Sequence, residues 1–156
     1  MPDQPIDEAT LRRKYAVELF NRTWDLLDKA DRTPEEADEM VHAAHASRHH
    51  WGQIGTPLEF ERGEWQISRV YATLGRAEPA LYHAHRCIEI CQDNNIADFD
   101  IAFAYEALAR AHTIAGQSDK GREYLDLGRK AAEGIADDGD RQYTLGELKS
   151  VSALLD

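Results

Sequence analysis

Residues 64–94, EWQISRVYATLGRAEPALYHAHRCIEICQDN, decide the fold that this chain is expected to adopt. They predict two helices joined by a tight turn at Gly75, because glycine readily takes the left-handed conformation that ends a helix. Residues 104–133, AYEALARAHTIAGQSDKGREYLDLGRKAAE, repeat the pattern with a turn at Gly116, 41 residues after Gly75. A fixed period of this size indicates stacked helical hairpins.

The rest of the chain predicts further helices of similar length. Thr33 and Thr56 each precede a proline and stand three residues before a glutamate, which is the capping-box signature of a helix start. Thr10 and Ser118 are the caps expected for the first and sixth helices. Residues 1–8 are expected to be disordered. The expected helices cover residues 10–30, 34–51, 57–74, 78–93, 98–115, 118–135 and 140–154.

The chain is therefore expected to form a single all-α domain over residues 1–156, with about seven helices. Six of them form three hairpins, and the seventh caps the apolar side of the last hairpin. Neighbouring hairpins must stack, because one hairpin cannot bury its apolar face alone. The 41-residue spacing also aligns Trp24, Trp65 and Glu106, which extends the repeat to the N-terminal hairpin.

Large and small residues alternate along both clear copies of the repeat, at positions where hairpins must nest. The first copy holds Glu64, Ile67, Ser68, Tyr71, Gly75, Ala80, Ala84 and Cys87. The second holds Tyr105, Leu108, Ala109, His112, Gly116, Gly121, Leu125 and Gly128. This pattern resembles the tetratricopeptide repeat (TPR), over residues 58–133 and more weakly over residues 10–51. The longer period and the absence of a proline at the repeat end depart from that family, whose period is about 34 residues.

The TPR resemblance implies a right-handed array whose first helix in each hairpin lines a concave groove. That groove is expected to bind a peptide or a protein, which is what the family mostly does. The groove positions carried over to this sequence are Trp24, Arg62, Trp65, Arg69, Phe103, Glu106 and Arg110. Tryptophan and arginine often anchor recognition surfaces. The alternative is that the tryptophans pack between helices and that the charged side chains pair with one another.

The charge balance narrows the classes of partner. The chain has 18 lysine and arginine residues against 29 acidic residues, which gives a net charge of −11. This charge argues against binding to nucleic acid or to anionic membranes, and it favours cationic partners. No apolar run approaches the roughly 20 residues that a bilayer requires. The first ten residues carry no signal-peptide pattern, so the protein is expected to be cytoplasmic. Cys87 and Cys91, one helical turn apart, are expected to be reduced thiols.

Histidines form the second unusual pattern. His42, His45 and His49 are spaced to share one helical face, and His45 with His49 has the one-turn spacing of a metal-chelating pair. If the hairpins stack in register, His83 could complete a metal site with His42 or His45. The alternative is that these histidines are polar packing residues.

No phosphate-binding loop, nucleophile elbow or complete metalloprotease motif is present in the sequence, so an enzyme is not predicted. The favoured function is a non-enzymatic module that binds a protein or peptide in its groove. The alternative is a protein that binds a transition metal or small ligand through His42, His45, His49 and His83. Self-association into a homodimer is a third hypothesis.

Overall fold

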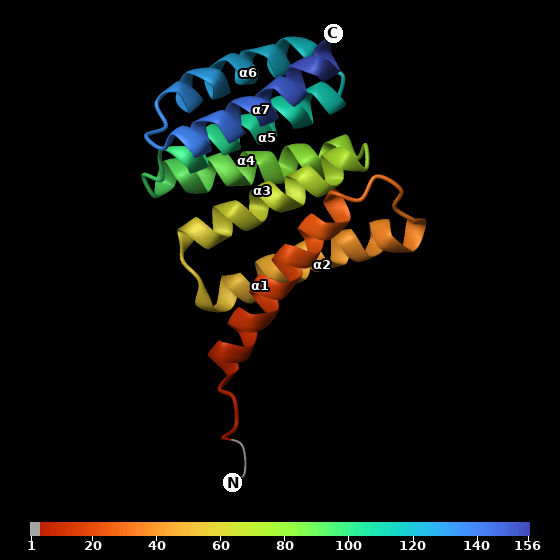
Figure 1. Ribbon diagram of the computed structural model, residues 1–156, viewed down its shortest axis with the longest axis vertical. Coiled ribbons are helices and arrows are strands. Elements are labelled where there is room, and N and C mark those ends of the chain that lie inside the picture. The colour runs from red at the N-terminus through yellow and green to blue at the C-terminus, as the bar shows by residue number, and fades with distance from the viewer. Residues whose placement is uncertain (1–3) are drawn as a thin grey trace.

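The computed structural model describes residues 4–156, and its regular structure is entirely helical over that range (Figure 1). The predicted all-α fold with about seven helices is confirmed. The helices are α1 (Glu8–Leu27), α2 (Pro34–Ile54), α3 (Pro57–Thr73), α4 (Ala77–Asp93), α5 (Phe99–Ile114), α6 (Ser118–Glu133) and α7 (Asp138–Leu155).

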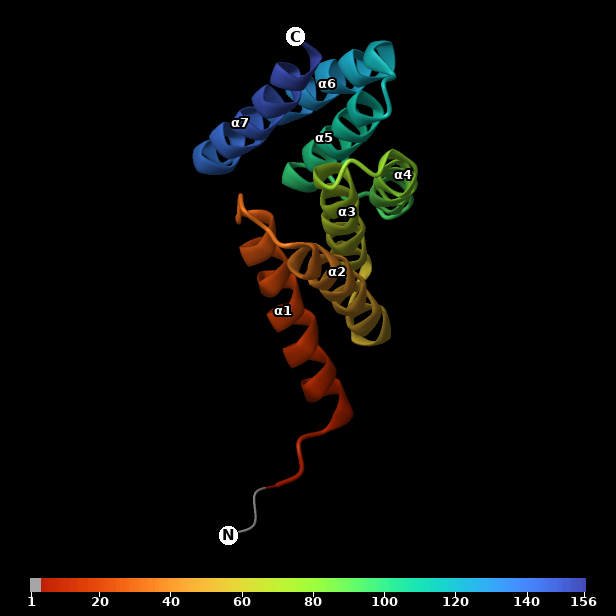
Figure 2. The same ribbon diagram turned by 90° about the vertical axis from the view of Figure 1, so that its right-hand side faces the viewer.

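Consecutive helices pair as hairpins, α1 with α2, α3 with α4, and α5 with α6. The hairpins stack in chain order, and α7 packs against both helices of the last one (Figure 1). The odd-numbered helices also contact one another in sequence, from α1 through α3 and α5 to α7, whereas α2, α4 and α6 lie farther apart from one another over the described residues. The odd-numbered helices therefore form one continuous layer, which Figure 2 shows with α1 and α7 at its two ends.

The turns inside the second and third hairpins have the same backbone geometry. Gly75 and Gly116 have φ angles of 73° and 78°, the left-handed region that disfavours other residues. After each glycine, a backbone N–H bonds back to a carbonyl five residues earlier, from Arg76 to Tyr71 and from Gln117 to His112, both at 2.9 Å. This is the hydrogen-bonding pattern of a Schellman cap. The two glycines predicted to end helices therefore do so.

Side chains cap the starts of α1, α2 and α7, and two of the expected caps, Thr10 and Ser118, are wrong. The Thr33 capping box is present, with the Glu36 N–H donating to the Thr33 hydroxyl at 3.2 Å. α1 begins at Glu8, inside the stretch expected to be disordered, because the Asp7 carboxylate and not Thr10 is its cap. Residues 4–7 are described and have no regular structure, and the part of that prediction at residues 1–3 lies outside the described residues. Ser118 is the first residue of α6 and not its cap.

The central core joins the second and third hairpins, and small residues let their helices approach closely. Trp65, Ile88, Phe103 and Leu108 supply most of its bulk. The alanines between them are 5% exposed or less and lie at positions 72, 80, 84, 104, 107 and 111. Since interiors are packed as tightly as organic crystals, this alternation fixes how one hairpin nests on the next.

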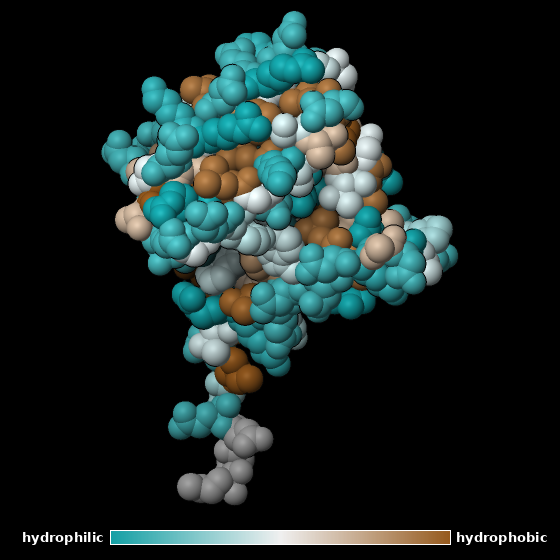
Figure 3. Space-filling model, turned by 45° about the horizontal axis from the view of Figure 1, so that its top comes forward, coloured by the Kyte–Doolittle hydropathy of each residue, from teal (hydrophilic) through white to brown (hydrophobic). Residues whose placement is uncertain are grey.

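The surface carries hydrophilic side chains with small, separated apolar patches in the view of Figure 3. No helix within residues 4–156 combines the length and hydropathy needed to cross a membrane. The most exposed aromatic side chains include Tyr82 on α4 and Tyr143 on α7, which are 59% and 50% exposed.

Replacing Gly128 with alanine should loosen the packing of α6 against α7. A methyl group there would lie 2.8 Å from Cδ2 of Leu148, which is 1% exposed, so the Leu148 side chain would have to shift within the core. We expect the free energy of unfolding to fall by about 1–3 kcal/mol, the usual cost of overpacking. Urea denaturation followed by circular dichroism measures the change.

Gly146→Ala is the matched control, since Gly146 is exposed on α7 and an added Cβ meets no atom within 4 Å. Alanine should stabilise the helix there by up to about 1 kcal/mol. Equal effects of the two substitutions would contradict the close approach of α6 and α7.

Candidate functional site: a groove along the odd-numbered helices

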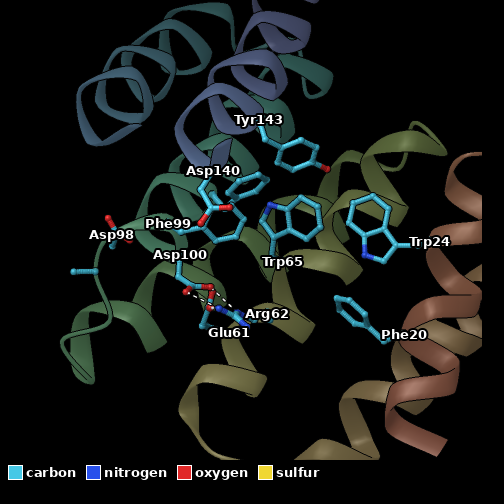
Figure 4. A pocket seen from close by; sticks show the side chains of 12 residues that line it. Phe20, Trp24, Glu61, Arg62, Trp65, Asp98, Phe99, Asp100, Asp140 and Tyr143 are labelled. Carbon is cyan, nitrogen blue, oxygen red and sulfur yellow. Dashed lines mark hydrogen bonds and ion pairs between the residues drawn. The ribbon is translucent and has the colours of Figure 1, made fainter. Parts of the chain in front are cut away.

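A groove with a volume of about 580 Å³ opens on the layer of odd-numbered helices. All four of these helices contribute side chains to it, so its shape depends on the stacking of the whole array (Figure 4). The lining residues are Phe20, Trp24, Glu61, Arg62, Trp65, Ala97, Asp98, Phe99, Asp100, Phe103, Asp140 and Tyr143.

Aromatic rings form a continuous wall across the groove. Trp24 on α1 lies 5.5 Å from Trp65 on α3, and Trp65 meets Phe103 on α5 edge-on at 5.4 Å between ring centroids. Phe103 in turn lies 4.5 Å from Phe99 and stacks at 5.8 Å on Tyr143 of α7. These distances are typical of attractive aromatic pairs, so the rings hold one another in place. Half-exposed Tyr143 and partly buried Trp24 present their surfaces to the groove.

Carboxylates dominate the charge of the groove. Asp98, Asp100 and Asp140 line one end of it, and Arg62 is the one cation among the lining residues that the structure describes. Arg62 is already engaged, because its Nε and Nη2 donate to the two carboxylate oxygens of Asp100 at 2.8 and 3.0 Å. Such a two-point pair is well ordered. The groove therefore offers to an incoming ligand the carboxylates of Asp98 and Asp140, neither of which has an ion pair with the lining residues that the structure describes.

Glu61 lies at the floor of this end, and it is only 1% exposed. Burial, reinforced by the neighbouring Asp100 carboxyl group, raises the pKa of Glu61 to about 11. The pKa of Asp100 is lowered instead, because the Arg62 guanidinium outweighs the effect of burial. Glu61 is thus the neutral member of the pair at neutral pH, and Asp100 is the charged one.

A buried ion-pair network closes the other end of the odd-numbered layer. Glu106, 1% exposed, accepts hydrogen bonds from Nε1 of Trp65 at 3.0 Å and from Nε of Arg110 at 2.7 Å. Nη1 of Arg69 lies 3.4 Å from the same carboxylate and donates to Glu147 of α7 at 2.8 Å. Burial opposes the charge of Arg69, but Glu106 and Glu147 more than offset it and raise its pKa. The network ties α3, α5 and α7 together.

The seven residues carried over as groove positions fall into two groups. Trp24, Arg62, Trp65 and Phe103 line the groove. Arg69, Glu106 and Arg110 do not, and they pair with one another and with α7 instead. Every member of both groups lies on an odd-numbered helix.

The main contribution that the sequence predictions omit comes from α7, which supplies Tyr143, Asp140 and Glu147. The signal was present in the 41-residue period, since Glu147 follows Glu106 by 41 residues and Tyr143 follows Ala102 by the same spacing. Extending the repeat once more places α7 as a fourth odd-numbered helix. Because the sequence predicts the seventh helix only as a cap on the last hairpin, none of its residues is expected in the groove.

The histidines lie behind the groove, between α2 and α4, and the structure brings two of the four predicted ligands together. The rings of His45 and His83 lie 5.5 Å apart. Nε2 of His45 is 2.8 Å from the Tyr71 hydroxyl, and Nδ1 of His83 is 2.6 Å from the Glu64 carboxylate. Burial lowers the pKa of His45, which favours the neutral ring.

The other two predicted metal ligands lie elsewhere on α2. His42 is exposed, and His49 is exposed with its ring 6.0 Å from that of His50. Among the described residues, the histidines, cysteines and carboxylates that converge closely enough for a metal ion are Glu61, Cys87 and Cys91. The histidines do not belong to that group.

Comparisons of the chain with family models, with curated proteins and with solved structures return no match. The chemistry of the groove itself therefore carries the functional conclusion.

Replacing Glu106 with glutamine should test the buried network. The glutamine amide keeps the shape of the side chain and an oxygen that can accept the hydrogen bond from Trp65. It removes the negative charge, so Arg69 and Arg110 keep less buried counter-charge. We expect the free energy of unfolding to fall by about 3 kcal/mol, as when one partner of a buried pair is removed. Glu123→Gln is the control, since its pair with Lys120 is exposed and its loss should have no measurable effect. Equal effects would show that the network contributes nothing beyond a surface pair.

The raised pKa of Glu61 predicts a pH-dependent stability. The folded protein keeps the proton on Glu61, whereas the unfolded chain releases it above an ordinary pKa of 4.5. Between that value and about 11, unfolding releases one proton, so the free energy of unfolding contributed by Glu61 falls as pH rises, by about 1.4 kcal/mol per pH unit.

Glu61→Gln, which mimics the protonated acid, should remove this dependence. Urea unfolding of both proteins at pH 6, 7 and 8 in buffer with EDTA measures it, and the difference in stability should grow with pH in favour of the glutamine variant. Parallel pH profiles would mean that Glu61 is ionised in the folded protein.

Proposed function

We propose that this chain is a TPR-like, non-enzymatic module that binds a protein or peptide segment in its groove. The observation that carries the proposal is the groove itself, in which a continuous aromatic wall stands beside carboxylates that have no cationic partner among the lining residues. The resemblance to TPR hairpins supports the same function, because those arrays use the corresponding face.

The chemistry of the groove favours a segment that carries a lysine or an arginine. A cation over an aromatic face is attracted by the ring quadrupole, and the attraction grows when the site excludes water. Tyr143 supplies such a face, and Asp140, from the first turn of the same helix, supplies the negative charge beside it. The net charge of −11 adds a long-range attraction for a basic partner.

The size of the groove fits part of a polypeptide. A volume of about 580 Å³ falls within the range of pockets that enclose drug-sized molecules. The groove extends from α1 to α7, so an extended segment can place some of its side chains in it and keep its remaining residues outside.

Binding should depend on Tyr143 and Asp140. The probe is chosen from a peptide array. Its peptides carry a single lysine or arginine, and each is matched to a peptide with glutamate at the same position. The peptide that binds most tightly is then titrated by fluorescence. We expect basic peptides to be selected, and Tyr143→Ala or Asp140→Asn to weaken the chosen one about tenfold, the effect of losing one cation–π or charge contact.

Tyr82→Ala is the matched control, since Tyr82 is also an exposed tyrosine but does not line the groove. The Tyr82→Ala variant should bind the chosen peptide with the same affinity as the unmodified protein. Selection of acidic peptides, or undiminished binding by both groove variants, would place the binding surface elsewhere.

A further inference from the structure

Two thiols and a carboxylate meet in the interior directly behind the acidic end of the groove. Cys87 and Cys91 stand one turn apart on α4, and both are fully buried. Their Sγ atoms lie 3.4 and 3.5 Å from Oε2 of Glu61 on α3. All three donor atoms fall within 4.8 Å of one another. The i, i+4 spacing on α4 and the position of Glu61 on the facing helix produce this convergence.

The two sulfur–oxygen distances match the edges of a zinc coordination tetrahedron. Zinc binds thiolate sulfur at about 2.3 Å and carboxylate oxygen at about 2.0 Å, so two such ligands in a tetrahedron lie about 3.5 Å apart. We propose that Glu61, Cys87 and Cys91 form a zinc-binding site. Thiolate ligands favour a soft or borderline metal such as zinc over magnesium or calcium.

The surroundings suit a bound cation. The second oxygen of Glu61, Oε1, is buried and receives no hydrogen bond, so this carboxyl group has an unfilled interaction in the interior. Zinc binding would displace the proton of Glu61 and the protons of both thiols into solvent, and the resulting two thiolates and one carboxylate around a divalent ion would leave one negative charge. The guanidinium of Arg62, whose Nε lies 3.8 Å from Oε1, is shared between this carboxylate and Asp100.

The site is reached from the groove. Glu61 and Asp100 both line the groove (Figure 4). The two thiols behind them have no solvent access. Three protein ligands leave the fourth position of a zinc ion for a further ligand, which must come from the groove side. The site would therefore connect the floor of the groove to α4 in the outer layer.

Metal analysis of the full chain, purified without an affinity tag, tests the site. We expect one zinc ion per chain after growth in zinc-supplemented medium. After removal of the zinc, titration with cobalt(II) should produce the intense near-ultraviolet absorption of thiolate-to-cobalt charge transfer, which a histidine–carboxylate site lacks. Absence of this band in the folded protein would overturn the proposal.

Variants separate this site from the histidines. The Cys87→Ala/Cys91→Ala protein should lose zinc, and Glu61→Gln should bind it at least about tenfold more weakly while keeping the thiols. His45→Ala/His83→Ala should retain the full zinc content and the charge-transfer band. Circular dichroism checks that each variant folds, and Glu61→Gln is the decisive variant if the double cysteine substitution does not fold. Zinc that survives in Glu61→Gln at unchanged affinity, or that is lost only with the histidines, contradicts the assignment.

Discussion

The carboxylate of Glu106 is the contact on which the inner layer of this protein depends. It accepts hydrogen bonds from Trp65 of α3 and Arg110 of α5, and it shares Arg69 with Glu147 of α7. A charge this deeply buried is tolerated only when it is fully paired. The same set of bonds that satisfies Glu106 therefore fixes the relative positions of three helices, and it orients the Trp65 ring that forms the middle of the groove.

The groove follows from that arrangement. With α7 held against α5, Tyr143 stacks on Phe103 and the aromatic wall becomes continuous from α1 to α7. At the opposite end, Arg62 satisfies Asp100 and leaves Glu61 as a neutral acid beside two thiols. Thus one layer of helices carries three environments in a row: a dry ion-pair network, an aromatic surface and an acidic floor.

Much of the fold could be predicted from the sequence because its signals are local. Turn glycines, capping boxes and the 41-residue period depend on neighbouring residues, and they located seven helices to within a few positions. Which of the predicted groove positions line the groove, and which form ion pairs instead, could not be predicted in the same way. Trp65 and Arg69 are one turn apart on the same helix, yet only Trp65 lines the groove, because Glu147, 78 residues beyond Arg69, covers the latter. The convergence of Glu61 with Cys87 and Cys91 likewise depends on the rotation of α3 against α4, which a repeat pattern alone does not specify.

The two sides of the groove are held by different kinds of contact. Buried ion pairs anchor the α7 side to α3 and α5. The α1 side is held to α3 by the Trp24–Trp65 ring contact, by a hydrogen bond from Gln66 to the Phe20 carbonyl, and by a buried apolar cluster in which Leu26 lies with Ile67 and Val70. Charge pairing therefore positions one wall of the groove, whereas apolar packing positions the wall opposite.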